Sequence, residues 1–481
     1  MTIHTSPNLS TEVPLVVDLD GTLIRSDMLL ESAIRLVRRN PLYVFLIFLW
    51  LCQGKRQLKT QIAQRVEIPC ALLPYHLEFL SYLQEQFRAH RKLVLATATD
   101  MRYAQQIAAH LGIFSDVWGT TAERNLAGEE KAKVLLQAYG EKGFDYAGNA
   151  TPDLKIWQHA RRAIVVNASA GLEQKARSIA EISHVFSSPK NVVKSVLKAI
   201  RVYQWVKNLL IFVPLFVAHQ WYQTTAIYFS AMAFVAFSLC ASAIYLINDL
   251  LDLDSDRAHK SKRNRPIASG NLSILTAVFL VFVLLLVGLL VAQLVSNEFC
   301  LILGTYLILT SAYSFYLKRI VLMDVLLLAF LYTIRVIAGA IAIQVEPSFW
   351  LLAFSMLIFT SLALIKRCAE LKSLKSQEKH AAHGRDYVVS DIPQLTSLGT
   401  AAGYGAVVIL ALYINSPDVA RHYQHPKFLW LLCPLCLYWI GRMWITTGRG
   451  LMHDDPIVYA AKDKVSLVIG ALGVAMVLFA L

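Results

Sequence analysis

The second half of this chain is a succession of apolar runs, most of them about 20 residues long, which is the length that crosses a bilayer as a helix. Backbone polar groups inside lipid must be bonded within the protein, so apolar runs of this length fold as helices. We therefore expect an all-α bundle of about nine transmembrane helices over residues 208–481. The candidate spans are roughly 208–222, 226–250, 272–293, 298–317, 320–343, 349–367, 393–414, 427–446 and 465–481.

Charge is distributed unevenly between the loops that join these spans. Every second loop is rich in Lys and Arg, whereas the alternate loops carry only Arg421 and Lys427. Basic loops stay in the cytoplasm, so we expect the N-terminal half to be cytoplasmic and the C-terminus to lie outside. Met1–Pro14 has no apolar core of a signal peptide. We expect a multi-pass protein of a bacterial inner membrane. Its net charge of +13 is expected to set membrane topology and to contact anionic headgroups or phosphates, and not to bind a nucleic acid.

The first half of the chain has a different pattern. Short apolar runs at Leu15–Leu19, Leu93–Ala96 and Ala163–Val166 alternate with helical stretches, which predicts buried parallel strands in a soluble α/β domain over residues 12–185. Residues 186–207 join the halves. Their apolar and basic residues fall on different faces of a helix, which predicts a basic amphipathic helix at the membrane interface; a plain linker helix is the alternative.

Acidic residues gather at the inner end of the second span, in the order Asn248-Asp249-x-x-Asp252-x-x-x-Asp256. Carboxylates at i, i+3 and i+7 share one face of a helix, where they repel each other and attract a cation. Hard oxygen ligands suit Mg²⁺, which is often shared with substrate phosphates. Basic residues follow at once and could hold those phosphates: Arg257, Lys262, Arg263 and Arg265. The segment predicts a metal–diphosphate site at a membrane surface.

Further polar side chains fall on the same inner side of the spans. Arg335 is the most informative of them, because an Arg so deep in a span needs a partner, a bundle interior or a ligand. It lies eleven residues, or about three turns, after Asp324 and therefore on the same helix face. We include as candidate substrate-binding residues Lys207, Asn208, Tyr313, Lys318, Asp324, Arg335, Lys366, Arg367 and Glu370.

The aspartate-rich motif resembles that of the UbiA superfamily of intramembrane prenyltransferases. Aromatic prenyltransferases of that superfamily carry a second D-x-x-x-D after the sixth span, whereas this chain has Lys366-Arg367-x-x-Glu370 there. The strings Gln204–Asn208, Asp256–Gly270 and Tyr313–Lys318 look instead like the polyprenyl-phosphate phosphoribosyltransferase branch, with Lys260 where that branch usually has Pro. The resemblance covers about residues 200–481. It implies Mg²⁺-dependent transfer of 5-phosphoribosyl from phosphoribosyl pyrophosphate to a polyprenyl phosphate.

Asp18-Leu19-Asp20-Gly21-Thr22 directly follows the first strand and resembles the first motif of the haloacid dehalogenase superfamily. That resemblance implies that Asp18 is the nucleophile, Asp20 the general acid and base, and Mg²⁺ the cofactor. It also implies that Thr97 binds the phosphoryl group and Lys131 steadies its charge, with Lys133 in reserve. Gly148-Asn149 and Asp153 match the metal-binding motif, although Asn149 stands where an Asp is usual. A degenerate, structural domain is the alternative.

The superfamily inserts a helical cap between its first and second motifs, here at about residues 27–90. Within it Pro41–Cys52 is strongly apolar but too short to span a bilayer. We expect either a buried cap helix or one that dips into the membrane surface. With both halves active, the chain would make a lipid-linked phosphoribose and then remove its 5-phosphate, giving a pentose donor for cell-envelope glycans. The alternative is an aromatic prenyltransferase that uses a prenyl diphosphate, with a regulatory or structural soluble domain.

Overall fold

The structure is a computed structural model that describes residues 13–121, 123–187, 191–376, 385–416, 419, 423–452 and 455–481. The N-terminal segment before residue 13 and Lys190 of the predicted linker helix lie outside the described residues. The chain divides into two compact units. Unit 1 comprises Met1–Ile200 together with Leu246–Leu280, and unit 2 comprises Arg201–Tyr245 together with Val281–Leu481. The segment that carries the aspartate motif therefore groups with the N-terminal domain.

Unit 1 is built on a six-stranded parallel sheet in the order β3-β2-β1-β4-β5-β6. The predicted strands are present, and β2 extends four residues beyond its predicted end, to Asp100. Apolar residues fill both faces of the central strands, as parallel sheets require. The strands are β1 (Leu15–Val17), β2 (Leu93–Asp100), β3 (Asp116–Thr120), β4 (Asp145–Gly148), β5 (Arg162–Val166) and β6 (Glu181–Phe186).

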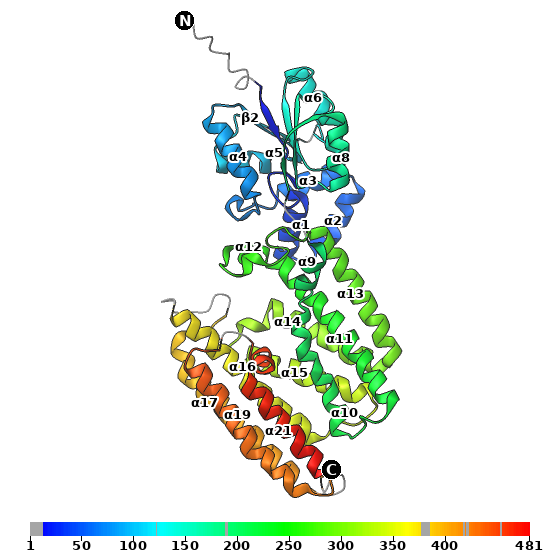
Figure 1. Cartoon of the computed structure of the whole chain (residues 1–481), viewed down its shortest axis with the longest axis vertical. Helices are drawn as coiled ribbons and strands as arrows, with labels where there is room; N and C mark the ends of the chain where they lie inside the picture. The colour runs from blue at the N-terminus through cyan, green and yellow to red at the C-terminus, as the bar shows by residue number, and fades with distance from the viewer. Residues whose placement is uncertain are drawn as a thin grey trace, which may run out of the picture. The chain divides into compact units, whose positions relative to one another are not determined.

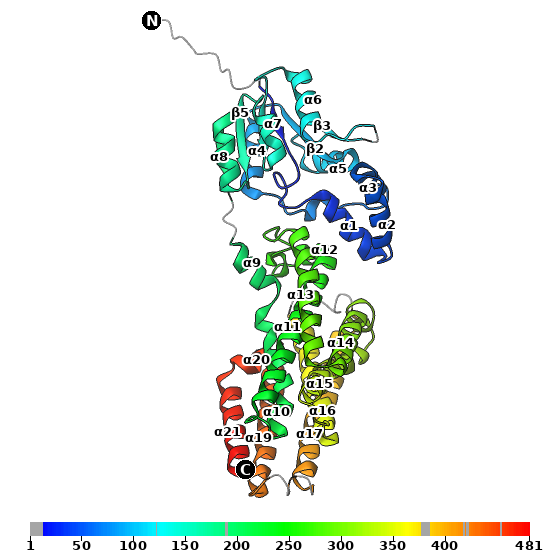
Figure 2. The same ribbon diagram turned by 90° about the vertical axis from the view of Figure 1, so that its right-hand side faces the viewer.

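Helices cover both faces of this sheet (Figure 2). On one face α4 (Leu77–Arg88) and α5 (Met101–Leu111) pack against Leu15, Val17 and Leu95. On the other face α6 (Glu129–Tyr139), α7 (Leu154–Trp157) and α8 (Ala170–Ile179) pack against Val16, Val94 and Ala96. Successive residues of one strand thus serve two cores, because strand side chains alternate between the faces. This is the doubly wound fold that the sequence predicts.

Three short helices form the cap: α1 (Met28–Arg39), α2 (Tyr43–Cys52) and α3 (Lys55–Ala63). They share a small apolar cluster centred on Leu36, Leu58 and Ile62. Asp27 caps the start of α1 by accepting from the backbone N–H of Leu30. The fourth helix of the predicted cap region, α4, packs on the sheet instead.

Unit 2 is a bundle of long apolar helices, and Figure 1 shows α16, α17, α19 and α21 side by side. Seven helices in the described part of the chain are long and apolar enough to cross a membrane, or up to nine if two bent pairs each count as one span. This agrees with the nine predicted spans. The seven are α11 (Thr224–Leu251), α13 (Ile274–Val295), α14 (Asn297–Phe315), α15 (Met323–Ala342), α16 (Phe349–Lys375), the span of α17 (Ile392–Ile414) and the span of α19 (Leu432–Gly448).

The two bent pairs lie at the ends of the membrane region. The first joins α9 (Val192–Ala199) to a 3-10 helix, η3 (Val202–Phe212), and to α10 (Val213–Val217), with a bend of 45°. Arg201 breaks this run because its backbone is left-handed, with φ of 53°. The second pair is α20 (Pro456–Lys462) and α21 (Lys464–Ala480), bent by 81° at Asp463. The predicted linker helix is thus a short α9 that exposes Val192, Val193 and Leu197.

Candidate active sites

The first site lies at the carboxyl edge of the sheet, between β1 and β4. Strand order reverses at this point, so the loops after the two strands diverge and leave a crevice, the usual ligand site of doubly wound sheets. A pocket of about 650 Å³ opens there. Asp18 and Asp20 line it from the loop after β1, and Asn149 and Asp153 line it from the loop after β4. The structure therefore brings together four predicted residues from opposite ends of the domain.

Lys131 is the charge partner of Asp18. Its Nζ lies 2.6 Å from Asp18 Oδ1 and 3.1 Å from the hydroxyl of Tyr146. Both charged side chains are nearly buried. Burial raises the pKa of Asp18 to about 6, although the charge of Lys131 acts in the opposite direction. Lys131 thus lies beside Asp18, where its role in steadying a phosphoryl group stays a prediction, while Lys133 lies on the surface beside Glu130.

Asp20 is held by two donors that aim its carboxylate into the same pocket. The backbone N–H of Met28, at the start of α1, donates to Oδ1 at 2.8 Å, and the Thr99 hydroxyl donates to Oδ2 at 2.7 Å. Burial raises the pKa of Asp20 to about 7, and the nearby charges of Asp27 and Asp18 add to that effect. A carboxyl group with a pKa near 7 is suited to give and take a proton at neutral pH.

Thr99, and not Thr97, is the threonine in the pocket wall. Thr97 is fully buried, and its hydroxyl accepts from the backbone N–H of Thr99 at 3.1 Å. The role predicted for Thr97, binding of the phosphoryl group, remains a prediction. Sequence reasoning passed over Thr99 because the strand was expected to end at Ala96.

The oxygen donors in this pocket suit Mg²⁺. Within the described residues no three His, Cys, Asp or Glu side chains converge as a metal cage. Both oxygens of Asp153 are engaged: Oδ1 accepts from Tyr146, and Oδ2 accepts from the N–H groups of Asn149 and Ala150 at 2.9 Å. Asp153 therefore orders the loop. The carboxylates of Asp18, Asp20 and Asp153 and the amide oxygen of Asn149 all line the pocket, and they are hard donors of the kind that binds Mg²⁺.

The aspartate motif spans a break between two helices. Helix α11 ends at Leu251 and α12 (Leu253–Ala258) begins after Asp252. Asp249 and Asp256 are buried, and a single cation joins them: Arg265 Nη1 lies 3.0 Å from Asp249 Oδ1 and 2.7 Å from Asp256 Oδ2. These two carboxylates thus approach one positive charge from two helices, whereas the sequence predicted one face of a single helix. Their oxygen donors and their spacing around one positive charge suit a divalent cation.

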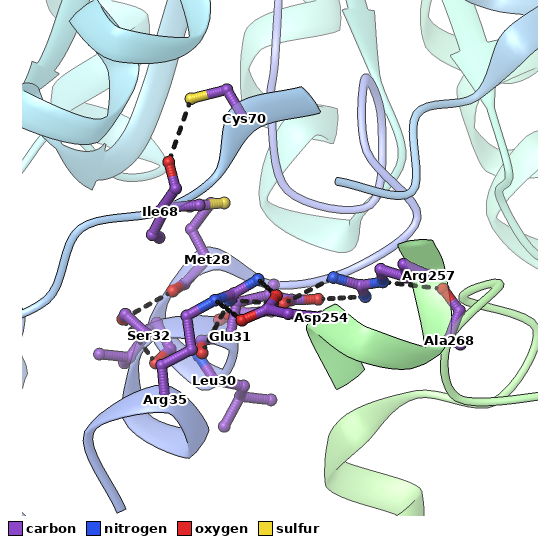
Figure 3. A network of polar contacts seen from close by, with 12 residues as sticks. Met28, Leu30, Glu31, Ser32, Arg35, Ile68, Cys70, Asp254, Arg257 and Ala268 are labelled. Atoms are coloured by element: carbon purple, nitrogen blue, oxygen red, sulfur yellow. Dashed lines mark hydrogen bonds and ion pairs between the residues drawn. The ribbon is translucent and has the colours of Figure 1, made fainter. Parts of the chain in front are cut away.

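A buried ion network holds this segment to the cap of the N-terminal domain (Figure 3). Glu31 of α1 is fully buried and accepts from both terminal nitrogens of Arg257, at 3.0 and 2.7 Å. Arg35, one turn later on α1, pairs with Glu31 at 2.8 Å and with Asp254 at 2.6 Å. Burial opposes the charge of Glu31, but hydrogen bonds and the charges of Arg257 and Arg35 outweigh it and hold the pKa of Glu31 below its usual value.

The basic residues after the motif separate into two groups. Arg257 Nε donates to the carbonyl of Ala268 at 2.9 Å, so all three nitrogens of its guanidinium are hydrogen-bonded within the protein. Arg265 is taken up by the two carboxylates. Lys262 and Arg263 are exposed, in the short turn Lys262–Asn264. Of the four predicted phosphate-binding cations in this segment, these two present their charge to solvent.

In unit 2 the deep cation Arg335 has partners on three neighbouring elements. It donates to Asn208 Oδ1 at 2.8 Å and to the Tyr306 hydroxyl at 3.1 Å, and Asn208 in turn donates to Ser238 at 2.9 Å. Its guanidinium also lies over the rings of Phe237, Tyr306 and Tyr332, between 4.9 and 5.6 Å from their centroids. Cation–π contacts of this kind stabilise a buried charge that has no carboxylate beside it.

A second cluster of unit 2 gathers around Asp455. Lys207 Nζ lies 2.9 Å and Lys366 Nζ 3.0 Å from Asp455 Oδ2, while the Tyr332 hydroxyl lies 3.4 Å from the same carboxylate. Two cations therefore share one anion, which leaves positive charge in excess. Lys366 is the more accessible of the two, with 36% of its side chain exposed. An excess of ammonium groups at such a point suits a phosphate.

A third cluster joins predicted residues on α14, α15 and α16. Arg367 is 1% exposed and pairs with Asp324 at 2.6 Å, with Glu370 at 2.5 Å and with the Tyr313 hydroxyl at 3.1 Å. Tyr387 also donates to Asp324, at 2.5 Å. Lys318 lies half-buried in the turn that follows α14. Asp324 thus pairs with Arg367, and the predicted common face with Arg335 does not bring those two side chains into one cluster.

Several residues of these clusters were absent from the predicted set. Asp455 had a signal, because it stands in an acidic run at the edge of the last span. No sequence signal pointed to Glu31 and Arg35, because an ordinary amphipathic helix also carries such charges. The additional members are Glu31, Arg35, Thr99, Tyr146, Ser238, Tyr306, Tyr332, Tyr387 and Asp455.

Fold and clusters together define a bundle of long apolar helices with buried ionic clusters, and a doubly wound α/β domain with a carboxylate-lined pocket. The family model described as the UbiA prenyltransferase family matches residues 209–450, and the chain belongs to that family. The N-terminal domain is a doubly wound α/β domain on a six-stranded parallel sheet.

Individual proteins are similar to nearly all of this chain or to parts of it. An uncharacterized protein of Sinorhizobium fredii, y4nM, is 36% identical over 96% of this chain and 90% of its own length. A decaprenyl-phosphate phosphoribosyltransferase of Corynebacterium glutamicum is 32% identical over 58% of this chain and 83% of its own length. A haloacid dehalogenase family hydrolase from Salmonella enterica serovar Typhi aligns over 38% of this chain and 69% of its own, with 15% identity and a TM-score of 0.29.

Proposed function

We propose that the protein transfers 5-phosphoribosyl from phosphoribosyl pyrophosphate to a polyprenyl phosphate, and that its N-terminal domain then removes the 5-phosphate of the product. The observation that carries the transferase proposal is the similarity to a decaprenyl-phosphate phosphoribosyltransferase over 83% of that protein's length. The proposed reactions take place at the cytoplasmic face of an inner membrane. The product would be a lipid-linked pentose, suited to donate that pentose to cell-envelope glycans.

The charge of unit 2 supports a phosphate acceptor. An aromatic prenyltransferase needs a second acidic motif after the sixth span, whereas this chain places Lys366 and Arg367 there. Lys366 shares Asp455 with Lys207, so the region holds more positive than negative charge. Cations gathered in this way favour the anionic phosphate of a polyprenyl phosphate over an uncharged aromatic ring.

In the proposed transfer, an oxygen of the lipid phosphate attacks the anomeric carbon of the ribose. The new C–O bond forms as the bond to pyrophosphate breaks, and both electrons of that bond leave with the pyrophosphate. The attacking oxygen is already anionic, so no side chain needs to remove a proton. In unit 2, Lys207 and Lys366 are the side chains proposed to hold a phosphate group. In unit 1, the exposed Lys262 and Arg263 are also proposed to bind phosphate.

Mg²⁺ is the proposed cofactor of both reactions. Asn248, Asp249, Asp252 and Asp256 would hold it in the transferase, and Asp18, Asp20, Asn149 and Asp153 in the hydrolase. When bound, the ion neutralises phosphate charge and stabilises pyrophosphate as a leaving group.

In the proposed hydrolysis Asp18 attacks the phosphorus of the 5-phosphate and Asp20 donates a proton to the departing ribose oxygen. Water then attacks the aspartyl phosphate while Asp20 takes back a proton, so phosphate is released and both carboxyl groups return to their first state. Lys131 and Thr99 position these carboxylates from the two sides of the pocket.

The test uses purified full-length protein, a polyprenyl phosphate, Mg²⁺ and phosphoribosyl pyrophosphate labelled in its ribose. Label should enter chloroform-extractable lipid, and Asp249→Ala should abolish that transfer. A second, less polar labelled lipid should form in the wild type and be missing from Asp18→Asn. If no label enters lipid of any chain length, the transferase proposal is wrong. Prenyl transfer from a prenyl diphosphate to an aromatic acceptor would then be assayed in its place.

A further inference from the structure

The cap helix α2 has an exposed apolar face that packs against no other part of the described structure. Its inner face, formed by Tyr43, Ile47 and Trp50, packs against α1 and α3. Its outer face is apolar throughout, and no residue of the helix is buried. Phe45 is 70% exposed and Phe48 is 66% exposed. The other large apolar side chains of this surface are Leu42, Val44, Leu46, Leu49 and Leu51. Of the two sequence expectations, a buried cap helix is wrong.

The charged residues around this helix are all basic. Between Glu31 and Glu67 the chain has no acidic residue but seven basic ones. Arg38 and Arg39 precede α2, and Lys55 and Arg56 follow it; all four are exposed. An apolar helix with cations at both ends matches a layer of anionic headgroups above an apolar interior.

We propose that α2 lies in the interfacial layer of an anionic lipid bilayer and holds the hydrolase cap on the membrane surface. The chain is itself a multi-pass membrane protein, so a lipid bilayer is always next to it. With ten apolar residues, α2 is too short to span and is suited to lie along the surface. Phe45 and Phe48 enter the acyl boundary, while the flanking cations contact lipid phosphates.

This anchoring bears on the hydrolase substrate, and here the inference rests on the proposed function. The helices on either side of α2 line the catalytic pocket, through Leu29 and Leu30 of α1 and Lys55 and Lys59 of α3. A cap fixed at the headgroup layer keeps this pocket at the level of a phosphate carried by a membrane lipid. The hydrolase is therefore an interfacial enzyme, selective for lipid-borne over freely dissolved phosphate esters.

The position of α2 can be measured with the native Cys52, since it is the exposed one of the seven cysteines. The full chain is labelled with a fluorophore that responds to polarity and is reconstituted in vesicles of phosphatidylcholine with phosphatidylglycerol. Lipids bearing a nitroxide on the acyl chain should quench this label, and aqueous iodide should not. A label on Gln174→Cys, exposed on α8, in a Cys52→Ser background should show the opposite pattern. If the Cys52 label is quenched by iodide alone, the proposal is wrong.

A second measurement compares two substrates in vesicles. Phe45→Gln with Phe48→Gln should lower hydrolysis of the lipid-borne phosphate at least about tenfold, a change equal to ~1.4 kcal/mol of lost membrane contact. Hydrolysis of soluble p-nitrophenyl phosphate should be unchanged, since both side chains point away from the fold. Equal loss on both substrates would overturn the interfacial role. If the wild type hydrolyses neither, the proposed function fails, and quenching at Cys52 alone decides where α2 lies.

Discussion

Asn149 stands where the haloacid dehalogenase motif usually has an Asp, and its position makes the consequence testable. It lines the pocket with Asp18 and Asp20, and its amide oxygen accepts from Thr22 at 3.2 Å. Asn149→Asp adds a negative charge to the proposed cation site. The Mg²⁺ concentration that gives half-maximal phosphate release should fall about tenfold, the effect of ~1.4 kcal/mol of added attraction. An unchanged Mg²⁺ requirement would show that Asn149 does not face the ion.

Lys131 offers a second test at the residue scale, with a matched control two positions along. Lys131→Met removes the charge that lies 2.6 Å from Asp18 and leaves a buried carboxylate without it. We expect phosphate release to fall about 100-fold or more, as when one preorganised electrostatic partner is lost. Lys133→Met, at an exposed position beside Glu130, should keep nearly full activity. Similar losses in both variants would mean that Lys131 acts on folding alone.

The elements were predictable where their cause is local. Short continuous apolar runs predict the strands, and Leu15–Val17 and Arg162–Val166 lie where those runs are. The end of β2 was missed because its last residues are polar and yet buried, with Asp100 capping α5. The bend at Asp252 was also missed, since a continuous helical pattern gives no sign of it. Spacing within one helix predicted a metal ion near Asp249 and Asp256; in the structure they lie on two helices and share Arg265.

Contacts between distant elements could not be predicted. Glu31 and Arg257 are 226 positions apart, and the sequence around either residue gives no sign that the two form an ion pair. The same holds for Lys207 and Asp455. Such pairs depend on how the elements pack, and one sequence carries no local trace of that packing.

The Glu31 network predicts that α1 and the aspartate segment are stabilised together. Glu31→Gln leaves Arg257 and Arg35 buried with half of their compensating charge removed. Breaking a buried pair in this way costs ~3–5 kcal/mol. We expect a lower melting temperature of the detergent-solubilised chain and a raised Mg²⁺ requirement for transfer. Glu173→Gln, which breaks an i,i+4 surface pair with Arg177, should change neither.

A double variant separates charge pairing from packing in the same network. Glu31→Gln with Arg257→Gln removes both members of the pair, so no lone charge remains between them. The double variant should therefore be more stable than the sum of the single variants predicts. Strict additivity would show that the two side chains act independently and that the pair does not join α1 to the aspartate segment.

At the scale of the whole molecule, the two proposed reactions differ in reversibility, which gives a reason for their fusion in one chain. Transfer exchanges one phosphate-linked bond for another, so added pyrophosphate can drive it backwards. Hydrolysis of the 5-phosphate consumes the lipid that the reverse reaction requires. We therefore expect that added pyrophosphate reverses the transfer when the hydrolase is inactive, and does not reverse it when the hydrolase is active.

A pyrophosphate chase measures this directly. Protein in vesicles is first charged with labelled phosphoribosyl pyrophosphate and polyprenyl phosphate, and excess pyrophosphate with Mg²⁺ is then added. Asp18→Asn should lose most of its lipid label, because its product still carries the 5-phosphate and re-enters the transferase. The wild type and the exposed-site control Lys133→Met should keep theirs as the dephosphorylated lipid. Equal loss in the wild type and Asp18→Asn would show that the hydrolase acts on another phosphate ester, and retention in both would show that transfer is irreversible without it.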